Sequence, residues 1–164
     1  MITAETVRER THHSGPFADT ITLDEDRRHR RRLAMVSDNG IAFMLNLPDA
    51  RLLRDGDGLV LSDGRVVEVK AMAEPLYEVR GRDPVHLLHL AWHLGNRHLA
   101  ASIEAERILI RRDRVIRAMV EGLGGIVAEV DAAFDPAGGA YAGTAHTHEH
   151  HHHGHDGGHS HHDR

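Results

Sequence analysis

Residues 83–96, with the sequence DPVHLLHLAWHLGN, decide the fold of this chain. Asp83 suits a helix N-cap, and Pro84 suits the first helical position. The backbone N–H that proline lacks would have no partner within the helix at that position. Apolar residues then continue through Leu94. The Gly-Asn pair that follows favours the left-handed backbone in which helices commonly end. The stretch therefore predicts a helix from Pro84 to Leu94 that stops at this pair.

Short apolar runs flank the predicted helix on both sides. Residues 76–79 read as a strand before it, and residues 99–103 and 107–110 read as two strands after it. Asp113 opens a second helix, which ends at a Gly-Gly pair before a last strand at 126–130. The apolar side of this second helix consists of Val115, Ile116, Met119, Val120 and Leu123. The order strand–helix–strand–strand–helix–strand is typical of the ferredoxin-like arrangement.

Residues 17–71 read as strands separated by tight turns. The Asn39-Gly40 pair separates two apolar runs, 32–36 and 41–45, and suits a type I′ hairpin turn. We therefore predict an α+β protein with a small N-terminal β-domain.

The predicted domain boundaries follow from changes in composition. We expect a β-rich domain over residues 1–73, a ferredoxin-like domain over 74–143 and a disordered histidine-rich tail over 144–164. Residues 72–75 are a plausible short linker. From Phe134 onward, proline, glycine and alanine lead into the tail.

The tail is the strongest chemical signal. Residues 145–164 read AHTHEHHHHGHDGGHSHHDR and contain ten of the seventeen histidines. Neutral imidazole is a common ligand for divalent transition metals. The segment is too polar to form a core, so it predicts a metal-binding tail. Its histidines are interspersed with other residues, unlike the unbroken run of an engineered tag.

Composition excludes several kinds of chemistry. The chain has no cysteine, which rules out disulfides and thiolate metal sites. Lys70 is the only lysine and follows Val69, so no phosphate-binding GxxxxGK[ST] loop exists. No pair of carboxylates stands out, and we expect no enzyme activity. The charged start and the lack of a run of about eighteen apolar residues predict a cytoplasmic protein that does not contact membranes.

The run RRHRRR at residues 27–32 is a weak signal for nucleic acid. It is short, lacks interleaved aromatic residues and lies in a chain of net charge −5. We therefore expect no nucleic-acid partner and interpret the run as a solvated strand edge or a contact for an acidic partner.

Four histidines lie in or just after the predicted helix at residues 84–94. His86, His89 and His93 share one helical face, and the last two have a spacing that could hold a metal. Leucines crowd the same helix, which favours packing or hydrogen bonding at a subunit contact. His98 differs because it follows the helix stop, where a side chain can project from a firmly held loop.

The sequence around His98 resembles a known family. HLGNRH at residues 93–98 resembles the signature of the UreE family, the nickel metallochaperones of urease maturation. FDPAGGAY at residues 134–141 looks like the segment that precedes the tail in that family, and the tail itself is rich in histidine. The resemblance covers nearly the whole chain.

The resemblance implies a fold, a site and partners. It implies a protein-binding N-terminal domain, like the peptide-binding domain of J-domain chaperones, before a metal-binding and dimerisation domain. It makes His98 the principal nickel ligand at a homodimer interface, and the GTPase UreG and apo-urease with its accessory proteins the partners. Some members carry an auxiliary His-Asp-His group. Arg112, Asp113 and Arg114 stand there in this chain, so we do not expect that site.

Histidines of the tail would complete the coordination of nickel around His98. We expect these tail ligands to be His146 and His148, nearest the folded domain, with His150, His151, His152, His153 and His155. Zinc and copper would compete for such a site, because imidazole sites bind copper more strongly than nickel. The alternative function is therefore storage or buffering of nickel, zinc or copper. A metal-dependent hydrolase is the third possibility.

Overall fold

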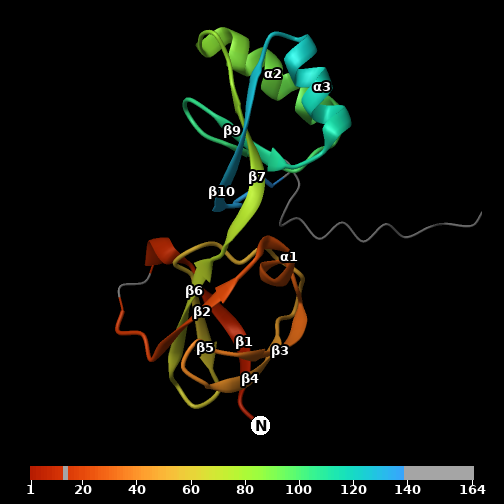
Figure 1. The fold of residues 1–164 in the computed structure, drawn as a ribbon. Helices are drawn as coiled ribbons and strands as arrows, with labels where there is room; N and C mark the ends of the chain where they lie inside the picture. Colours follow the sequence, from red (N-terminus) through yellow and green to blue (C-terminus); the bar gives the residue numbers. More distant parts are fainter. Residues whose placement is uncertain (13–14, 139–164) are drawn as a thin grey trace, which may run out of the picture.

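The computed structural model of the protein describes residues 1–12 and 15–138, and these form two sheets joined by a continuous chain (Figure 1). The first sheet has the strand order β2-β6-β5-β1-β4-β3. Its elements are β1 (Thr3–Arg8), the 3-10 turn η1 (Arg10–His12), β2 (Asp19–Leu23), the short helix α1 (Glu25–Arg28), β3 (Arg32–Val36), β4 (Ala42–Asn46), β5 (Gly58–Leu61) and β6 (Val66–Ala71).

The second sheet has the antiparallel order β10-β7-β9-β8. Its elements are β7 (Ala73–Arg80), α2 (Pro84–Asn96), β8 (Ala101–Ile103), β9 (Ile108–Arg111), α3 (Arg114–Gly122) and β10 (Ile126–Ala133). The order from β7 to β10 is strand–helix–strand–strand–helix–strand, as the sequence predicted. The described residues are therefore mixed α+β, with strands predominating.

Each sheet has its own apolar core. Leu45 and Leu59 are fully buried in the first sheet. In the second, Leu90 and Leu94 of α2 and Val120 of α3 pack in one cluster with residues of β7 and β9. Full burial of a leucine stabilises a fold by roughly 1.5–3 kcal/mol. This packing holds α2 firmly against its sheet.

Helix α2 begins as predicted and ends differently. The Asp83 carboxylate accepts the His86 N–H at 2.7 Å, and Pro84 occupies the first turn. Gly95 remains helical, however, and the left-handed residue that closes the helix is His98, with a φ of 57°. The buried Leu94 keeps the last turn on the sheet, so the helix continues to Asn96.

Two other expectations about the N-terminal half were wrong, and one strand was not predicted. This strand is β1, which pairs with both β4 and β5 inside the first sheet although its sequence is polar. Only Met72 separates β6 from β7, so residues 73–75 belong to a strand and not to a linker. The run at 27–32 is not wholly a solvated edge, because Arg28 has no exposed surface.

Helix α3 and the turn at residues 37–41 also depart from prediction. Val115 of α3 is 69% exposed, and only Ile116 and Val120 of that helix are buried. Gly40 has a φ of 102°, but Asn39 does not have a positive φ, so the turn is not type I′.

Asp19 explains the conformation of this turn. Its buried carboxylate accepts the Ser37 hydroxyl at 2.5 Å, the Asn39 backbone N–H at 2.9 Å and the Asn39 side-chain amide at 2.7 Å. These bonds, led by that from Ser37, lower the pKa of Asp19 from 3.8 to about 2. The carboxylate therefore ties the connection between β3 and β4 to β2.

The Asp19 network should make the fold sensitive to acid. Because the pKa is depressed in the folded state, the stabilisation is complete above about pH 4 and is lost as pH falls toward 2. We expect the free energy of unfolding to fall less steeply over this range in Asp19→Asn than in the parent protein. Urea unfolding followed by circular dichroism measures this slope. Glu5→Gln, at an exposed site on β1, is the control, and equal slopes for the parent protein and Asp19→Asn would contradict the account.

Candidate metal site at the end of helix α2

His98 lies on the turn between α2 and β8 and is exposed. Its backbone N–H donates to the Gly95 carbonyl at 3.0 Å, and the Leu99 N–H reaches the Leu94 carbonyl at 3.4 Å. A positive φ is uncommon for a residue other than glycine and often marks a functional position. The imidazole is thus presented to solvent from a turn that the buried end of α2 holds in place.

The histidines inside α2 do not join His98 in a cluster. His86 is buried, and its Nδ1 accepts the Arg82 N–H at 3.0 Å. Its Nε2 therefore carries the hydrogen and donates to the Leu123 carbonyl at 2.9 Å. Both ring nitrogens are occupied by bonds within the chain, so His86 has a structural role; the predicted subunit contact of the three histidines stays a prediction. His89 is exposed, and the half-buried His93 ring meets Trp92 edge-on at 5.2 Å between centroids.

Within residues 1–12 and 15–138, no three side chains of His, Asp or Glu lie in a group that could hold a metal ion. Within the described residues, His98 therefore does not belong to a complete ligand set at this turn.

An apolar stripe lies on the exposed side of the same helix. Val85, Leu88 and Trp92 are 63%, 67% and 65% exposed, and their spacing places them on one face of α2. Exposed apolar residues that gather on one face mark contact surfaces in many proteins. The stripe leads along α2 toward the turn that carries His98.

The residues at the auxiliary position of the family have structural roles here. The Arg112 guanidinium donates to the Leu76 carbonyl at 3.1 Å and to the Val130 carbonyl at 3.2 Å, which joins β7 and β10 to the start of α3. The Asp113 carboxylate caps α3 by accepting the N–H groups of Val115 and Ile116. Arg112 and Asp113 thus stabilise the start of α3.

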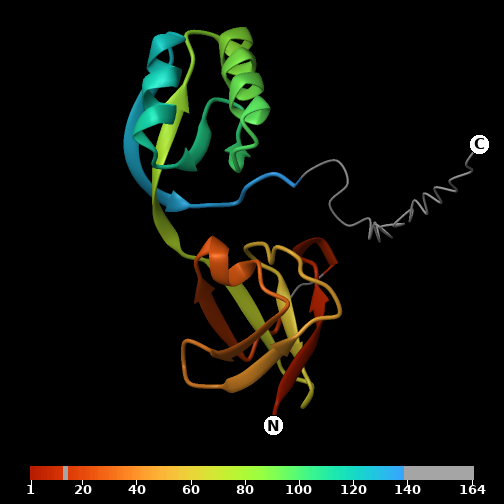
Figure 2. The ribbon, with the colours of Figure 1, turned by 90° about the vertical axis from the view of Figure 1, so that its right-hand side faces the viewer.

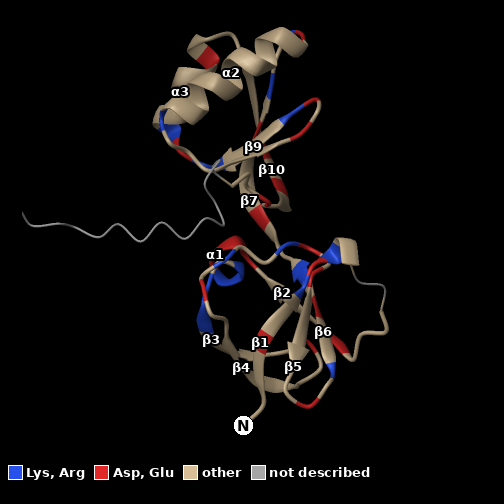
Figure 3. Cartoon of the chain, turned by 180° about the vertical axis from the view of Figure 1, so that it is seen from behind, with Lys and Arg blue, Asp and Glu red and all other residues tan. Residues whose placement is uncertain are grey.

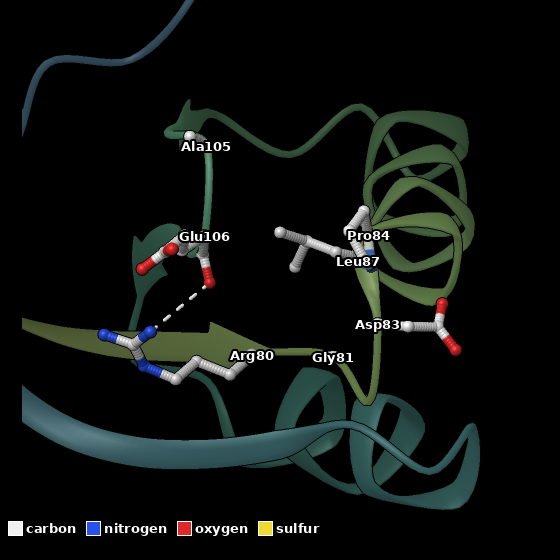
Figure 4. Close-up of a pocket in the computed structure, with 7 residues that line it drawn as sticks. All are labelled: Arg80, Gly81, Asp83, Pro84, Leu87, Ala105 and Glu106. Carbon is white, nitrogen blue, oxygen red and sulfur yellow. Dashed lines mark hydrogen bonds between the residues drawn. The ribbon is translucent and has the colours of Figure 1, made fainter.

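A small hollow lies elsewhere in the second sheet (Figure 4). It has a volume of about 250 Å³ and lies between the end of β7, the start of α2 and the turn before β9. Arg80 donates to the Glu106 carbonyl across it at 3.5 Å, and the Leu87 side chain points into it. None of the described residues that line it is a histidine, so we do not assign metal binding to it.

The tail ligands expected from the sequence, His146, His148, His150, His151, His152, His153 and His155, lie outside the described residues. The chain just before them is described. Ala137 donates its N–H to the Ala101 carbonyl at 2.9 Å, so the described end of the chain lies beside a residue only three positions after His98.

The ordered contacts of residues 134–138 were not predicted, because the composition of this segment indicated only the approach to a tail. Phe134 is fully buried and packs with Leu76 and Leu109. The signal available in the sequence was a single large aromatic residue directly before Asp-Pro.

No helix in the described part of the chain is long and apolar enough to span a membrane.

Comparison with known proteins covers both halves of the chain. Residues 3–72 match the model of the UreE urease accessory protein N-terminal domain, and residues 74–162 match that of the C-terminal domain.

Several named relatives agree with these matches. The urease accessory protein UreE of Chelativorans sp. (strain BNC1) is 64% identical over 145 residues, which are 88% of this chain and 90% of that protein. UreE of Rhodopseudomonas palustris (strain HaA2) is 57% identical over 150 residues, or 89% of this chain and 70% of the relative. UreE 1 of Brucella suis biovar 1 (strain 1330) is 53% identical over 126 residues, 77% of this chain and 78% of that protein. The chain belongs to the UreE family of urease accessory proteins.

Proposed function

We propose that this protein is a dimeric nickel metallochaperone that donates Ni(II) during assembly of the urease metal centre. Membership of the family implies a role in urease maturation. The observation that best supports nickel donation is the exposed His98 on a rigid turn beside an unpartnered apolar stripe. Such an arrangement would supply one chain's share of the ligands of a metal site shared by two chains, here called a half-site.

A homodimer would complete that half-site. We infer that residues 74–143 form a ferredoxin-like metal-binding and dimerisation domain and that residues 1–73 form a protein-binding domain. A two-fold axis places identical residues opposite each other, so a contact through Leu88 and Trp92 would bring two His98 side chains to one ion. The aromatic side chain at position 92 has the character of an interface hot spot.

Two imidazoles leave coordination positions open on Ni(II). We assign these positions to water and to tail histidines, first His146 and His148 and then His150, His151, His152, His153 and His155. An incomplete protein ligand set lets the ion leave for an acceptor. Zn(II) and Cu(II) would compete, because imidazole alone does not select nickel.

Transfer to urease requires partners. We propose that the GTPase UreG and apo-urease with its accessory proteins receive the ion in the cytoplasm, and that residues 1–73 contribute to these contacts. The chain has no phosphate-binding lysine loop, so any GTP needed for insertion would be supplied by a partner. The second candidate function is metal buffering by the tail, which the ten tail histidines favour.

Truncation after Gly143 separates a donor from a buffer. A donor should keep about one tightly bound nickel ion per dimer through the paired His98 side chains and still activate urease at ample nickel. A buffer should lose almost all capacity and all effect on urease. Nickel titration by calorimetry, with a urease activation assay on the same samples, measures both. Loss of all nickel binding and of urease activation on truncation would contradict the donor function.

A further inference from the structure

The chain leaves β10 and runs between the two sheets before the tail begins (Figure 2). We call residues 134–137 the tail root. From the second sheet, Phe134 packs against Leu76 and Leu109, and the Arg111 guanidinium lies 5.1 Å from the centre of the Phe134 ring. Ala137 then bonds to β8 through Ala101. These contacts fix the root along the lower end of the second sheet.

The N-terminal half holds the same root through two arginines, Arg28 of α1 and Arg54 of the loop between β4 and β5. Arg28 is fully buried, and its guanidinium donates to the carbonyls of Leu23 at 3.2 Å, of Leu53 at 3.1 Å and of Phe134. A buried charge without polar partners would be costly, so these three carbonyls determine where the side chain can sit. One of the three belongs to the tail root.

Arg54 makes the second connection. Its guanidinium pairs with the Asp135 carboxylate and donates to the Pro136 carbonyl at 2.9 Å. Both side chains of this ion pair are about one third exposed, at 30% and 34%, so the pair is partly shielded from solvent. Charged residues of both signs gather where the two sheets meet, around α1 and the start of β7 (Figure 3).

Arg54 and the root also line one groove. The groove has a volume of about 940 Å³, and Ala100 of the turn after His98 lines it together with Pro136 and Ala137. Arg54, the end of the root and the turn that follows His98 thus meet at one groove.

The number of residues between the root contacts and the nearest tail histidine limits how far that histidine can lie from His98. Ala101 follows His98 by three residues, a span of at most about 11 Å. His146 follows Ala137 by nine residues, which reach at most about 30 Å. With Ala137 bonded to Ala101, the first tail histidines are within reach of the imidazole of His98. Without the root contacts, the last paired residue before the tail would be Ala133 at the end of β10.

We infer that Arg28 and Arg54 are positioning residues of the N-terminal half, which hold the tail root next to the turn that carries His98. This inference rests on the proposed nickel-donor function. The N-terminal sheet thereby raises the effective concentration of tail-bound nickel at the His98 site, in addition to any contact it makes with partners.

The positioning can be tested without nickel. The chain has no cysteine, so a nitroxide on Gly143→Cys is a unique spin label. In the full-length, metal-free protein we expect it to broaden the amide signals of residues 99–102. Arg54→Gln and Asp135→Asn should each remove most of this broadening, whereas Arg51→Gln should not, because Arg51 lines the same groove but pairs with Glu9. Circular dichroism verifies that each variant is folded.

A second measurement tests the consequence for nickel. In Arg54→Gln, the nickel concentration for half-maximal urease activation should rise about three- to tenfold, with the activation at saturating nickel unchanged. Equal broadening in the parent protein and in folded Arg54→Gln and Asp135→Asn would overturn the inference, and so would an unchanged half-maximal concentration. Failure of nickel donation itself would instead appear as no activation by the parent protein at any nickel concentration.

Discussion

His98→Ala should strongly reduce nickel delivery while most of the nickel capacity remains. The tail keeps its ten histidines in this variant, so bulk binding should fall by only about one ion per dimer. The shared site would lose both of its fixed imidazoles at once, and we expect urease activation to fall by at least about tenfold, the effect of roughly 1.4 kcal/mol. Nickel titration and urease activation on the same preparations measure the two quantities.

His12→Ala is the control for this substitution. His12 is also an exposed histidine, but it lies on the 3-10 turn η1 and not on α2 or on the turn that follows it. The variant should leave delivery unchanged. If His98→Ala and His12→Ala had the same effect, His98 would have no special role and the proposed site would be wrong.

Trp92→Glu should break the dimer. The side chain is 65% exposed in the single chain, so the substitution should not disturb the fold of the monomer. Loss of an aromatic hot spot costs about 2 kcal/mol or more of binding free energy. The dissociation constant of the dimer should therefore rise by at least about 30-fold. Analytical ultracentrifugation over a range of protein concentrations measures this change.

The control for Trp92→Glu is Val115→Glu. Val115 is 69% exposed and lies on α3, a different helix from the one that carries the stripe. We expect this variant to remain dimeric. An unchanged dimer mass for Trp92→Glu would place the subunit contact on another surface.

Local signals in the sequence were enough to predict the order along the chain of the strands and helices that form the second sheet and its cover. Asp83 and Pro84 define the start of α2, and Asp113 defines the start of α3, because capping depends on a few neighbouring residues. The end of α2 could not be placed in this way. It depends on the burial of Leu94 against the sheet, and burial is set by residues distant in sequence.

Other parts of the structure rest on contacts between residues far apart in the chain. β1 has few apolar residues, and its place between β4 and β5 comes from pairing with strands about 40 to 60 residues away. Arg28 stands in a run of basic residues typical of a surface, yet its partner Phe134 is 106 residues away. No local pattern contains this information.

The candidate site was predicted through its motif more than through its chemistry. HLGNRH drew attention to His98, and the structure adds that the residue is exposed, has a positive φ and lies near the bonded tail root. The apolar stripe was not predicted, because leucines and tryptophan in a helix are usually buried.

The central claim is that two chains share one exchangeable nickel ion through paired His98 side chains. The most direct test is native mass spectrometry of the protein truncated after Gly143, during titration with Ni(II), next to the same protein with His98→Ala. We expect a dimer that binds about one ion, and a His98→Ala dimer that binds none. A protein that stays monomeric with and without nickel would contradict the claim.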